Sequence, residues 1–326
     1  MLIIFWFIIL FAALAALLLA VDFFIESGEK LAHHWGWPDN VKSIVLVSLA
    51  TILPELMIAL MAVVAHQTVL ISSVVAGSMI ANIYLIVGLT AVTAGTIVVV
   101  KHWWHIDVPL LFACLALFIV VVWDRTVTLG EGVVLLLAAG VYLFYWAKII
   151  GHTYHDRESE IPAHRGHRHH LHHRIIPEEH WILILSNVFS IIILFLAAFW
   201  IVKSSSYLAA LLHWDLDAFG LIVLGIAVAL PEIVLAFQAA RAKKFELALG
   251  NVIGASLFNV LLVLAIPSLF TSFVVPEIIF SAALPFLVAG IFWYAFTTIK
   301  HKIFRYEGVL YLIIFLGFIL KVIGVY

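Results

Sequence analysis

Apolar stretches of about 20 residues follow one another along the chain, and they restrict its fold more than any other feature. About 20 helical residues cross the hydrocarbon core of a bilayer, so each stretch is long enough to span it. The runs are continuously apolar rather than alternating, which excludes a membrane β-barrel. Ten stretches fit the hydropathy, at residues 2–24, 41–65, 69–97, 107–123, 130–149, 181–203, 217–240, 245–270, 275–299 and 306–325. The sequence therefore predicts an all-α polytopic membrane protein with ten transmembrane helices embedded in the lipid bilayer.

Composition narrows the class further. Of the 326 residues, 65% are hydrophobic and only 11% are charged, which leaves no soluble domain of useful size and no expected nucleic-acid partner. The one cysteine, Cys114, lies in an apolar segment, so disulfides and thiolate metal sites are excluded. No nucleophile, base and orienting group recur at a usable spacing. We therefore expect neither an enzyme nor a resident cofactor.

Two carboxylates lie inside the apolar stretches, and each belongs to a copy of the same motif. Glu55 and Glu232 each follow a Leu-Pro pair, and each is followed by a glycine 22 residues later and an asparagine 27 residues later. At this constant offset of 177, the aligned positions are Pro54 with Pro231, Gly77 with Gly254, and Asn82 with Asn259. Two homologous halves are the simplest explanation.

The ten stretches divide into five and five, which predicts two inverted five-helix repeats of the kind found in secondary transporters. The first covers residues 1–149, the second covers 181–326, and a polar linker at 150–180 separates them. Fourteen lysines and arginines fall on the side of the linker and three on the other side. The positive-inside rule then puts the linker in the cytoplasm and both termini outside, with the plasma (inner) membrane as the expected location.

The linker is rich in histidine. Its central histidines are His164, His167, His169, His170, His172 and His173. Such a tract can bind a regulatory divalent metal or change charge between about pH 5 and 8. The alternative is a solvated linker whose histidines do nothing essential. A transport role is not expected, because transport sites lie near the bilayer midplane.

Each proline next to a glutamate removes one helical hydrogen bond. Pro54 releases the carbonyl of Ala50, and Pro231 releases that of Ala227. In lipid a released carbonyl needs a partner inside the protein, and a bound cation is one such partner. A charged side chain at a helix centre costs roughly 2.5 to 3.5 kcal/mol, so an intramembrane glutamate is a functional candidate by default.

Two ionised glutamates carry two negative charges, which match one divalent ion or two protons. Calcium accepts six to eight oxygens at about 2.3–2.6 Å in irregular geometry, whereas magnesium demands a tight octahedron. The small residues at 77 and 254 are typical of close helix packing, and packing alone would explain them. Their pairing with an asparagine and an intramembrane glutamate, twice, favours a site that includes Asn82 and Asn259.

These motifs carry a resemblance to a known family. Residues 50–55 read Ala-Thr-Ile-Leu-Pro-Glu and residues 227–232 read Ala-Val-Ala-Leu-Pro-Glu; residues 76–82 and 250–259 form the second part of each motif. They resemble the two alpha repeats, here 50–82 and 227–259, of the cation/calcium exchanger superfamily. That superfamily contains sodium/calcium exchangers and calcium/proton antiporters. Gly-Asn-Val-Ile-Gly at 250–254 followed by Phe-Asn at 258–259 is the most specific match.

The resemblance implies that Glu55 and Glu232 bind calcium together with the backbone carbonyls of Thr51 and Val228. It also implies that hydroxyl groups of both repeats contribute to sodium sites. Here Thr51 and Ser78 keep their usual positions and Ser256 stands one position late. At four positions where the family pattern has hydroxyl residues, this chain has apolar residues instead: Ile52, Val228, Ala229 and Ala255.

Methyl groups cannot replace the water around sodium, so these departures argue against sodium and towards protons. Two close carboxylates in a water-poor cavity hold protons more readily than separate ones do. We therefore expect calcium/proton exchange by alternating access, nominally two protons per calcium ion, with the first and sixth spans sliding against the rest.

Other functions stay open. Sodium/calcium exchange is the nearest alternative, because water or carbonyls could replace the missing hydroxyls. Manganese, magnesium or zinc could be the divalent substrate, and the histidine tract gives zinc its only support. A different class, a membrane cation or pH sensor that has lost transport, would also keep the motifs.

Overall fold

The computed structural model describes the chain except for residues 37–38, 99–100, 158–179, 243–244, 301 and 325–326. For residues 39–45, 47–48, 98, 101–107, 145–157, 180 and 246–248 it describes the backbone alone. The described residues are mostly helical, and four of the helices that they form, labelled η, have the wider π geometry. The first half contains α1 (Leu2–His34), α2 (Asp39–Val64), α3 (Val69–Ile80), η1 (Ala81–Ile86), α4 (Val87–Ala94), β1 (Thr96–Val98), α5 (Lys101–Val122), β2 (Thr126–Val127) and α6 (Leu129–Arg157).

The second half repeats this order with more interruptions. It contains α7 (His180–Leu212), α8 (Leu216–Phe219), η2 (Gly220–Leu224), α9 (Gly225–Val228), α10 (Leu230–Arg241), α11 (Phe245–Phe258), η3 (Asn259–Val263), α12 (Ala265–Ser268), β3 (Phe273–Val274), η4 (Ile279–Ala283), α13 (Leu284–Ile299), β4 (Lys302–Phe304) and α14 (Arg305–Val322). Each predicted span coincides with one helix or with a run of consecutive helices.

Within the described residues, five helical segments are long and apolar enough to cross a membrane. They are Leu2–His34, Val69–Ala94, Trp181–Leu212, Leu249–Ser268 and Ile279–Ile299. A sixth arises if the bent pair Leu216–Val228 and Leu230–Arg241 counts as one span. Shorter apolar helices occur at Leu49–Val64, Val108–Val122 and Leu129–Phe144. The prediction of a helical membrane protein is confirmed at this level, except that short strands, which the all-α prediction did not include, lie between some of the helices. The count of ten spans stays a prediction.

The first and sixth spans are longer than predicted. α1 continues to His34 rather than residue 24, and α7 continues to Leu212 rather than residue 203. Polar residues near the predicted ends do not stop either helix, because their hydroxyl groups bond back to the preceding turn. Ser27 donates to the Phe23 carbonyl at 2.7 Å, and Ser204 donates to the Trp200 carbonyl at 2.6 Å. Each serine thus finds its partner inside its own helix.

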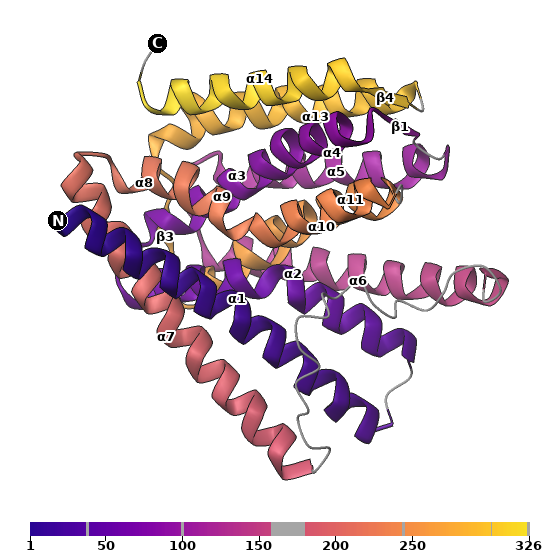
Figure 1. Cartoon of the computed structure of the whole chain (residues 1–326), viewed down its shortest axis with the longest axis horizontal. Helices are drawn as coiled ribbons and strands as arrows, with labels where there is room; N and C mark the ends of the chain where they lie inside the picture. The colour runs from indigo at the N-terminus through magenta and orange to yellow at the C-terminus, as the bar shows by residue number, and fades with distance from the viewer. Residues whose placement is uncertain (37–38, 99–100, 158–179, 243–244, 301, 325–326) are drawn as a thin grey trace.

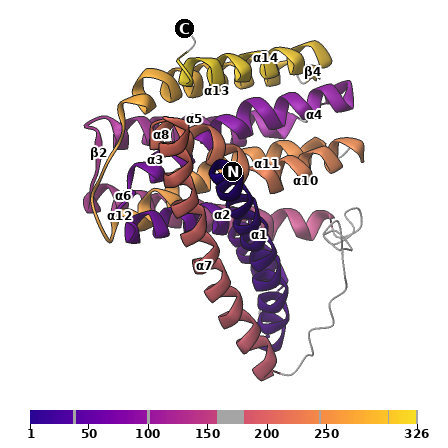
Figure 2. The ribbon, with the colours of Figure 1, turned by 60° about the vertical axis from the view of Figure 1, so that its left-hand side comes forward.

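α1 and α7 lie side by side and cross the rest of the bundle obliquely (Figures 1 and 2). They run antiparallel, since Trp6 near the start of α1 stacks on Tyr207 near the end of α7 with ring centroids 4.3 Å apart. Their outer faces carry exposed apolar side chains such as Phe11 and Phe189. The other helices form the main bundle, and the buried core extends from it to the inner faces of α1 and α7, where Leu17 and Leu194 are fully buried.

Two short antiparallel ladders join the halves. β1 pairs with β4, with Thr96 opposite Phe304, and β2 pairs with β3, with Val127 opposite Phe273. Adding 177 to 96 gives 273, and subtracting 177 from 304 gives 127, so one ladder reproduces the register of the other. β1 precedes α5 and β2 follows it, so the ladders lie at opposite ends of that helix (Figure 1).

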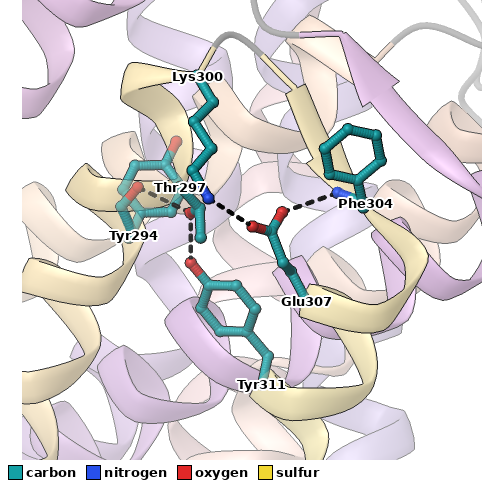
Figure 3. A network of polar contacts seen from close by, with 6 residues as sticks. All are labelled: Tyr294, Thr297, Lys300, Phe304, Glu307 and Tyr311. Carbon is teal, nitrogen blue, oxygen red and sulfur yellow. Dashed lines mark hydrogen bonds and ion pairs between the residues drawn. The ribbon is translucent and has the colours of Figure 1, made fainter.

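A polar network near the C-terminus ties α13 to α14 (Figure 3). The Thr297 and Tyr311 hydroxyl groups lie 2.9 Å apart, and the Glu307 carboxylate accepts the Phe304 N–H at 2.9 Å and contacts Lys300 at 3.5 Å. Nearby, the Tyr84 hydroxyl of η1 donates to the Phe286 carbonyl of α13 at 2.8 Å. This last bond anchors the π-helical turn that carries Asn82.

Candidate cation-binding site

Glu55 and Glu232 are both buried in the bundle, with 1% and 3% of their surfaces exposed. Glu55 follows Pro54 inside the continuous helix α2. Glu232 lies in the first turn of α10, beyond a 43° bend between α9 and α10. Pro231 also lies in that first turn. The N–H groups of a first turn have no partner within the helix, so the missing N–H of proline costs no helical hydrogen bond there. At this break the Ala227 carbonyl, which Pro231 cannot bond, accepts the N–H of Ala229.

The two carboxyl groups are close enough to interact electrostatically. Among the described residues, the Oε2 atoms of Glu55 and Glu232 are fully buried and have no hydrogen-bond partner. The Oδ1 atom of Asn82 is also fully buried without a hydrogen-bond partner, and 1% of the surface of this residue is exposed. A buried oxygen without a partner costs free energy, and more when it is charged. Three such acceptor oxygens fit a bound cation or protons better than they fit an empty core.

Asn259 connects the halves at this site. Its Nδ2 atom donates to the Ser78 hydroxyl at 2.7 Å, and its side chain also hydrogen-bonds the Glu55 carboxyl group. The Ser78 hydroxyl in turn donates to the Val75 carbonyl at 3.2 Å. Residues of α2, α3 and η3 therefore meet at one point, which brings together Glu55, Ser78 and Asn259 as the motifs predict.

Both asparagines stand in π-helical turns. Asn82 is the second residue of η1, and Asn259 is the first residue of η3. The wider turn closes with a bond from the Leu264 N–H to the Asn259 carbonyl, five residues back, at 3.2 Å. Such turns occur often at functional sites because they redirect side chains within a helix. Sequence reasoning found both asparagines through their spacing but not the turns that hold them.

The remaining predicted residues surround this point less directly. Thr51 is partly exposed one turn before Glu55, and Val228 is the buried last residue of α9. The Ser256 hydroxyl donates to the Val252 carbonyl at 2.8 Å, within its own helix. The Ser256 carbonyl contacts the Cys114 thiol of α5 at 3.5 Å, a contact that the sequence did not indicate.

The predicted metal-binding histidines all lie outside the described residues: His164, His167, His169, His170, His172 and His173. Within the described part of the chain, no three His, Cys, Asp or Glu side chains gather in a way that could hold a metal. The candidate site therefore consists of a carboxylate pair supplemented by amide, hydroxyl and carbonyl oxygens.

A glycine contact packs α3 against the helices that lead to Glu232. A Cβ atom added at Gly77 would lie 2.0 Å from the Leu221 carbonyl oxygen, and one added at Gly225 would lie 2.6 Å from the Gly77 carbonyl carbon. The two backbones are therefore in direct contact. Sequence reasoning found Gly77 but missed Gly225, because the position aligned with it in the other half is a serine, Ser48.

The fold and the site define a helical membrane protein with a buried acid pair. The model of the sodium/calcium exchanger protein family matches residues 5–148 and 182–324. The chain belongs to this family, within the cation/calcium exchanger superfamily. The family consists of transporters rather than enzymes.

Individual relatives cover most of the chain. The inner membrane protein YrbG of Escherichia coli is 27% identical over 276 residues, which are 81% of this chain and 79% of YrbG. The sodium/calcium exchanger MaX1 of Methanosarcina acetivorans is 24% identical, with 96% and 97% covered. A solved structure of the sodium-calcium exchanger NCX_Mj, soaked with 10 mM Na+ and 10 mM Sr2+, has the same fold, with a TM-score of 0.60, 22% identity, and 99% and 98% covered.

Proposed function

We propose that this protein is a calcium/proton antiporter in which Glu55 and Glu232 together bind either one calcium ion or two protons. The observation that carries the proposal is that one carboxyl oxygen of each glutamate is buried without a partner, as is the Oδ1 atom of Asn82. Two carboxylates balance the charge of one divalent ion, and two protons neutralise the same pair. The site can thus be filled by either substrate without leaving a net charge in the membrane.

Calcium suits the available ligands better than other divalent ions do. The site offers oxygen atoms from carboxylates, an amide and the backbone carbonyls near Thr51 and Val228, which are hard ligands. No histidine or cysteine is among these groups, which disfavours zinc. Loose geometry favours calcium over magnesium because magnesium requires a tight octahedron. Manganese remains an alternative divalent substrate.

Protons are the proposed coupling ion because hydroxyl ligands are scarce. Ala255 replaces a hydroxyl residue of the family pattern, as do Ile52, Val228 and Ala229. Ser78 accepts a hydrogen bond from Asn259 and donates to Val75. Sodium needs several oxygens to replace its water, and the methyl groups at the substituted positions supply none. Sodium/calcium exchange is the second candidate, favoured by the family description and by the relative MaX1.

Two inverted five-helix repeats are the architecture that we propose for this exchange. Equivalent strands β1 and β3 belong to ladders at opposite ends of α5, as inversion of one half relative to the other requires. The end with the β1–β4 ladder carries Lys300, Lys302 and Arg305, whereas Arg125 lies at the β2–β3 end. The positive-inside rule then assigns the β1–β4 end to the cytoplasm and both termini to the outside of the plasma membrane.

Calcium flux into proteoliposomes distinguishes the two candidates. A pH gradient and a sodium gradient are imposed separately, with the membrane potential clamped by potassium and valinomycin. Calcium uptake driven by the pH gradient, with no uptake driven by sodium, is the expected result. Sodium-driven uptake at constant pH would overturn the proton assignment. Unlabelled manganese, magnesium and zinc, added as competitors, identify the preferred divalent ion.

Removal of the amide that joins the halves should weaken calcium binding. In Asn259→Ala, the Glu55 carboxyl group and the Ser78 hydroxyl lose a shared partner. A hydrogen bond to a charged group contributes about 1.5–3 kcal/mol, so the calcium concentration for half-maximal flux should rise about 10- to 100-fold. Ser78→Ala is the matched control, since it removes one of the two bonds and should have a smaller effect. Equal effects of the two variants would contradict this role of Asn259.

A further inference from the structure

Lys203 is a cation on α7 without an accompanying carboxylate. It is the last residue of the predicted span 181–203, and α7 continues beyond it to Leu212. Its side chain is partly exposed and forms no ion pair within the described part of the chain. A lysine at the edge of the hydrocarbon is stable only where its ammonium group reaches the interface, so a counter-charge is expected at that level.

Two aromatic rings hold the ammonium group of Lys203. Its Nζ atom lies 5.1 Å from the ring centroid of Trp200 and 5.5 Å from that of Phe199. Both distances are within the range of a cation–π attraction. A ring face attracts the cation but carries no net charge and no carboxylate or phosphate oxygen. The ammonium group therefore keeps its charge and its N–H donors for an anionic partner.

α1 contributes to the same cluster, at the end where it lies beside the last turns of α7 (Figures 1 and 2). Trp6 of α1 stacks on Tyr207 of α7 with ring centroids 4.3 Å apart and an angle of 12° between the planes. Tyr207 follows Lys203 by four residues, so the two side chains are neighbours on one face of α7. Tryptophan and tyrosine are typical of the membrane–water interface, which places this cluster at the level of the lipid headgroups.

An apolar stripe leads from Lys203 along α7 towards the membrane interior. Its members are exposed and lie at steps of three or four residues from Lys203, hence on the same face of the helix. They are Phe189, Ile192, Leu196, Phe199 and Trp200. The surface therefore has a cation at one end and a long apolar part below it, which complements an amphiphile with an anionic head.

The opposite end of the α1–α7 pair is built differently. By the 177-residue offset, Glu26 is aligned with Lys203, and Lys30 is aligned with Tyr207. Glu26 and Lys30 form an ion pair of 3.1 Å, so that end supplies its own counter-charge. The end at Lys203 has a cation and no acid partner. Its counter-charge has to come from outside the chain.

We propose that Lys203, Trp200, Tyr207 and Trp6 bind the phosphate group of an anionic phospholipid whose acyl chain lies along the apolar stripe of α7. Phosphodiesters are the anions that a bilayer supplies at this depth, and a lysine near an anionic leaflet is attracted to it. A zwitterionic lipid brings its own ammonium group next to Lys203 and therefore binds more weakly. In the proposed topology the bound lipid belongs to the outer leaflet. The proposal goes beyond the exchange reaction and does not depend on which ions are exchanged.

Native mass spectrometry of the delipidated protein tests the site by counting bound lipids. Protein in detergent is titrated with dioleoylphosphatidylglycerol or with dioleoylphosphatidylcholine, which has the same chains and a zwitterionic head. The wild type should bind its first phosphatidylglycerol at a concentration about fivefold lower than its first phosphatidylcholine. Lys203→Gln should lose this preference, and Lys203→Arg should keep it. Lys30→Gln, at the aligned end of the pair, is the matched control and should also keep it.

The melting temperature separates lipid binding from misfolding. Without lipid, Lys203→Gln should melt like the wild type, because the partly exposed Lys203 side chain pairs with no carboxylate. Phosphatidylglycerol should raise the melting temperature of the wild type more than that of Lys203→Gln, since a ligand stabilises only the protein that binds it. Trp200→Leu is a second variant that keeps the charge and the apolar surface but removes a ring that holds Nζ. Its preference for phosphatidylglycerol should fall at least twofold.

Several outcomes would overturn the lipid site. These are equal binding of the two lipids by the wild type, an unchanged preference in Lys203→Gln, or a loss in Lys30→Gln as large as that in Lys203→Gln. Inorganic phosphate in hundredfold excess distinguishes the source of the anion. It should not displace phosphatidylglycerol, because it has no acyl chain to cover the apolar stripe, and displacement would overturn a phospholipid as the occupant.

Discussion

Glu55→Gln and Glu232→Gln should each reduce calcium flux at least 100-fold, to the level of empty liposomes. Glutamine keeps the shape of glutamate and removes its charge, so a bound calcium ion would face one carboxylate instead of two. Leaving a charge uncompensated in a buried site costs about 3–5 kcal/mol, which corresponds to a factor of 100 or more. The same variants should lose proton-driven exchange because one of the two proton-binding groups is gone.

Protein stability separates this effect from misfolding. Without calcium, each glutamine variant should melt at the same temperature as the wild type or higher, because a buried amide costs less free energy than an unpartnered acid. Glu277→Gln is the matched control, since its side chain is 63% exposed and pairs with Arg125 at the surface. It should leave flux unchanged. Retention of a tenth of the wild-type flux in either site variant would contradict the paired-carboxylate site.

Gly77→Ala should destabilise the protein by about 3 kcal/mol or more, because the added methyl group would lie 2.0 Å from a backbone oxygen of Leu221. No side chain can rotate away to relieve that contact, so a whole helix must move. Gly254→Ala is its counterpart at the aligned position. There the methyl group meets nothing, and the gain in helix propensity is up to about 1 kcal/mol.

Thermal unfolding in detergent, followed by loss of the monodisperse protein, measures the difference between the two alanine variants. Gly77→Ala should melt well below the wild type, and Gly254→Ala at or slightly above it. Equal melting temperatures would contradict the packing difference between the halves.

The acid pair could be predicted from the sequence because few physical explanations exist for glutamate in an apolar run. The repeat at 177 residues then indicated Asn82 and Asn259, and the family resemblance indicated Ser78. Of these, Ser78 and Asn259 meet beside Glu55. Helix positions followed from hydropathy. The ends of α1 and α7 did not, because Ser27 and its counterpart Ser204 bond to their own helices instead of ending them.

Other features could not be predicted because they depend on packing between distant segments. The strand Thr96–Val98 consists of β-branched residues, but it lies at the end of an apolar stretch that was assigned to a transmembrane helix. It forms by pairing with residues 302–304 of the other half. Gly225 gains its role from Gly77, more than 140 residues away. Because the two halves have similar motifs, the sequence also cannot indicate that their aligned glycines are packed differently. Only the structure distinguishes the contact at Gly77 from the open space at Gly254.

Proton release on calcium binding tests the central claim most directly. Purified protein in weakly buffered detergent solution is titrated with calcium between pH 5.5 and 8 while a pH indicator counts released protons. If the carboxyl pair holds either two protons or one calcium ion, up to about two protons should leave per calcium bound at the acidic end, and none in Glu55→Gln,Glu232→Gln. Calcium binding that releases no protons anywhere in this range, or binding that survives in the double variant, would contradict the account.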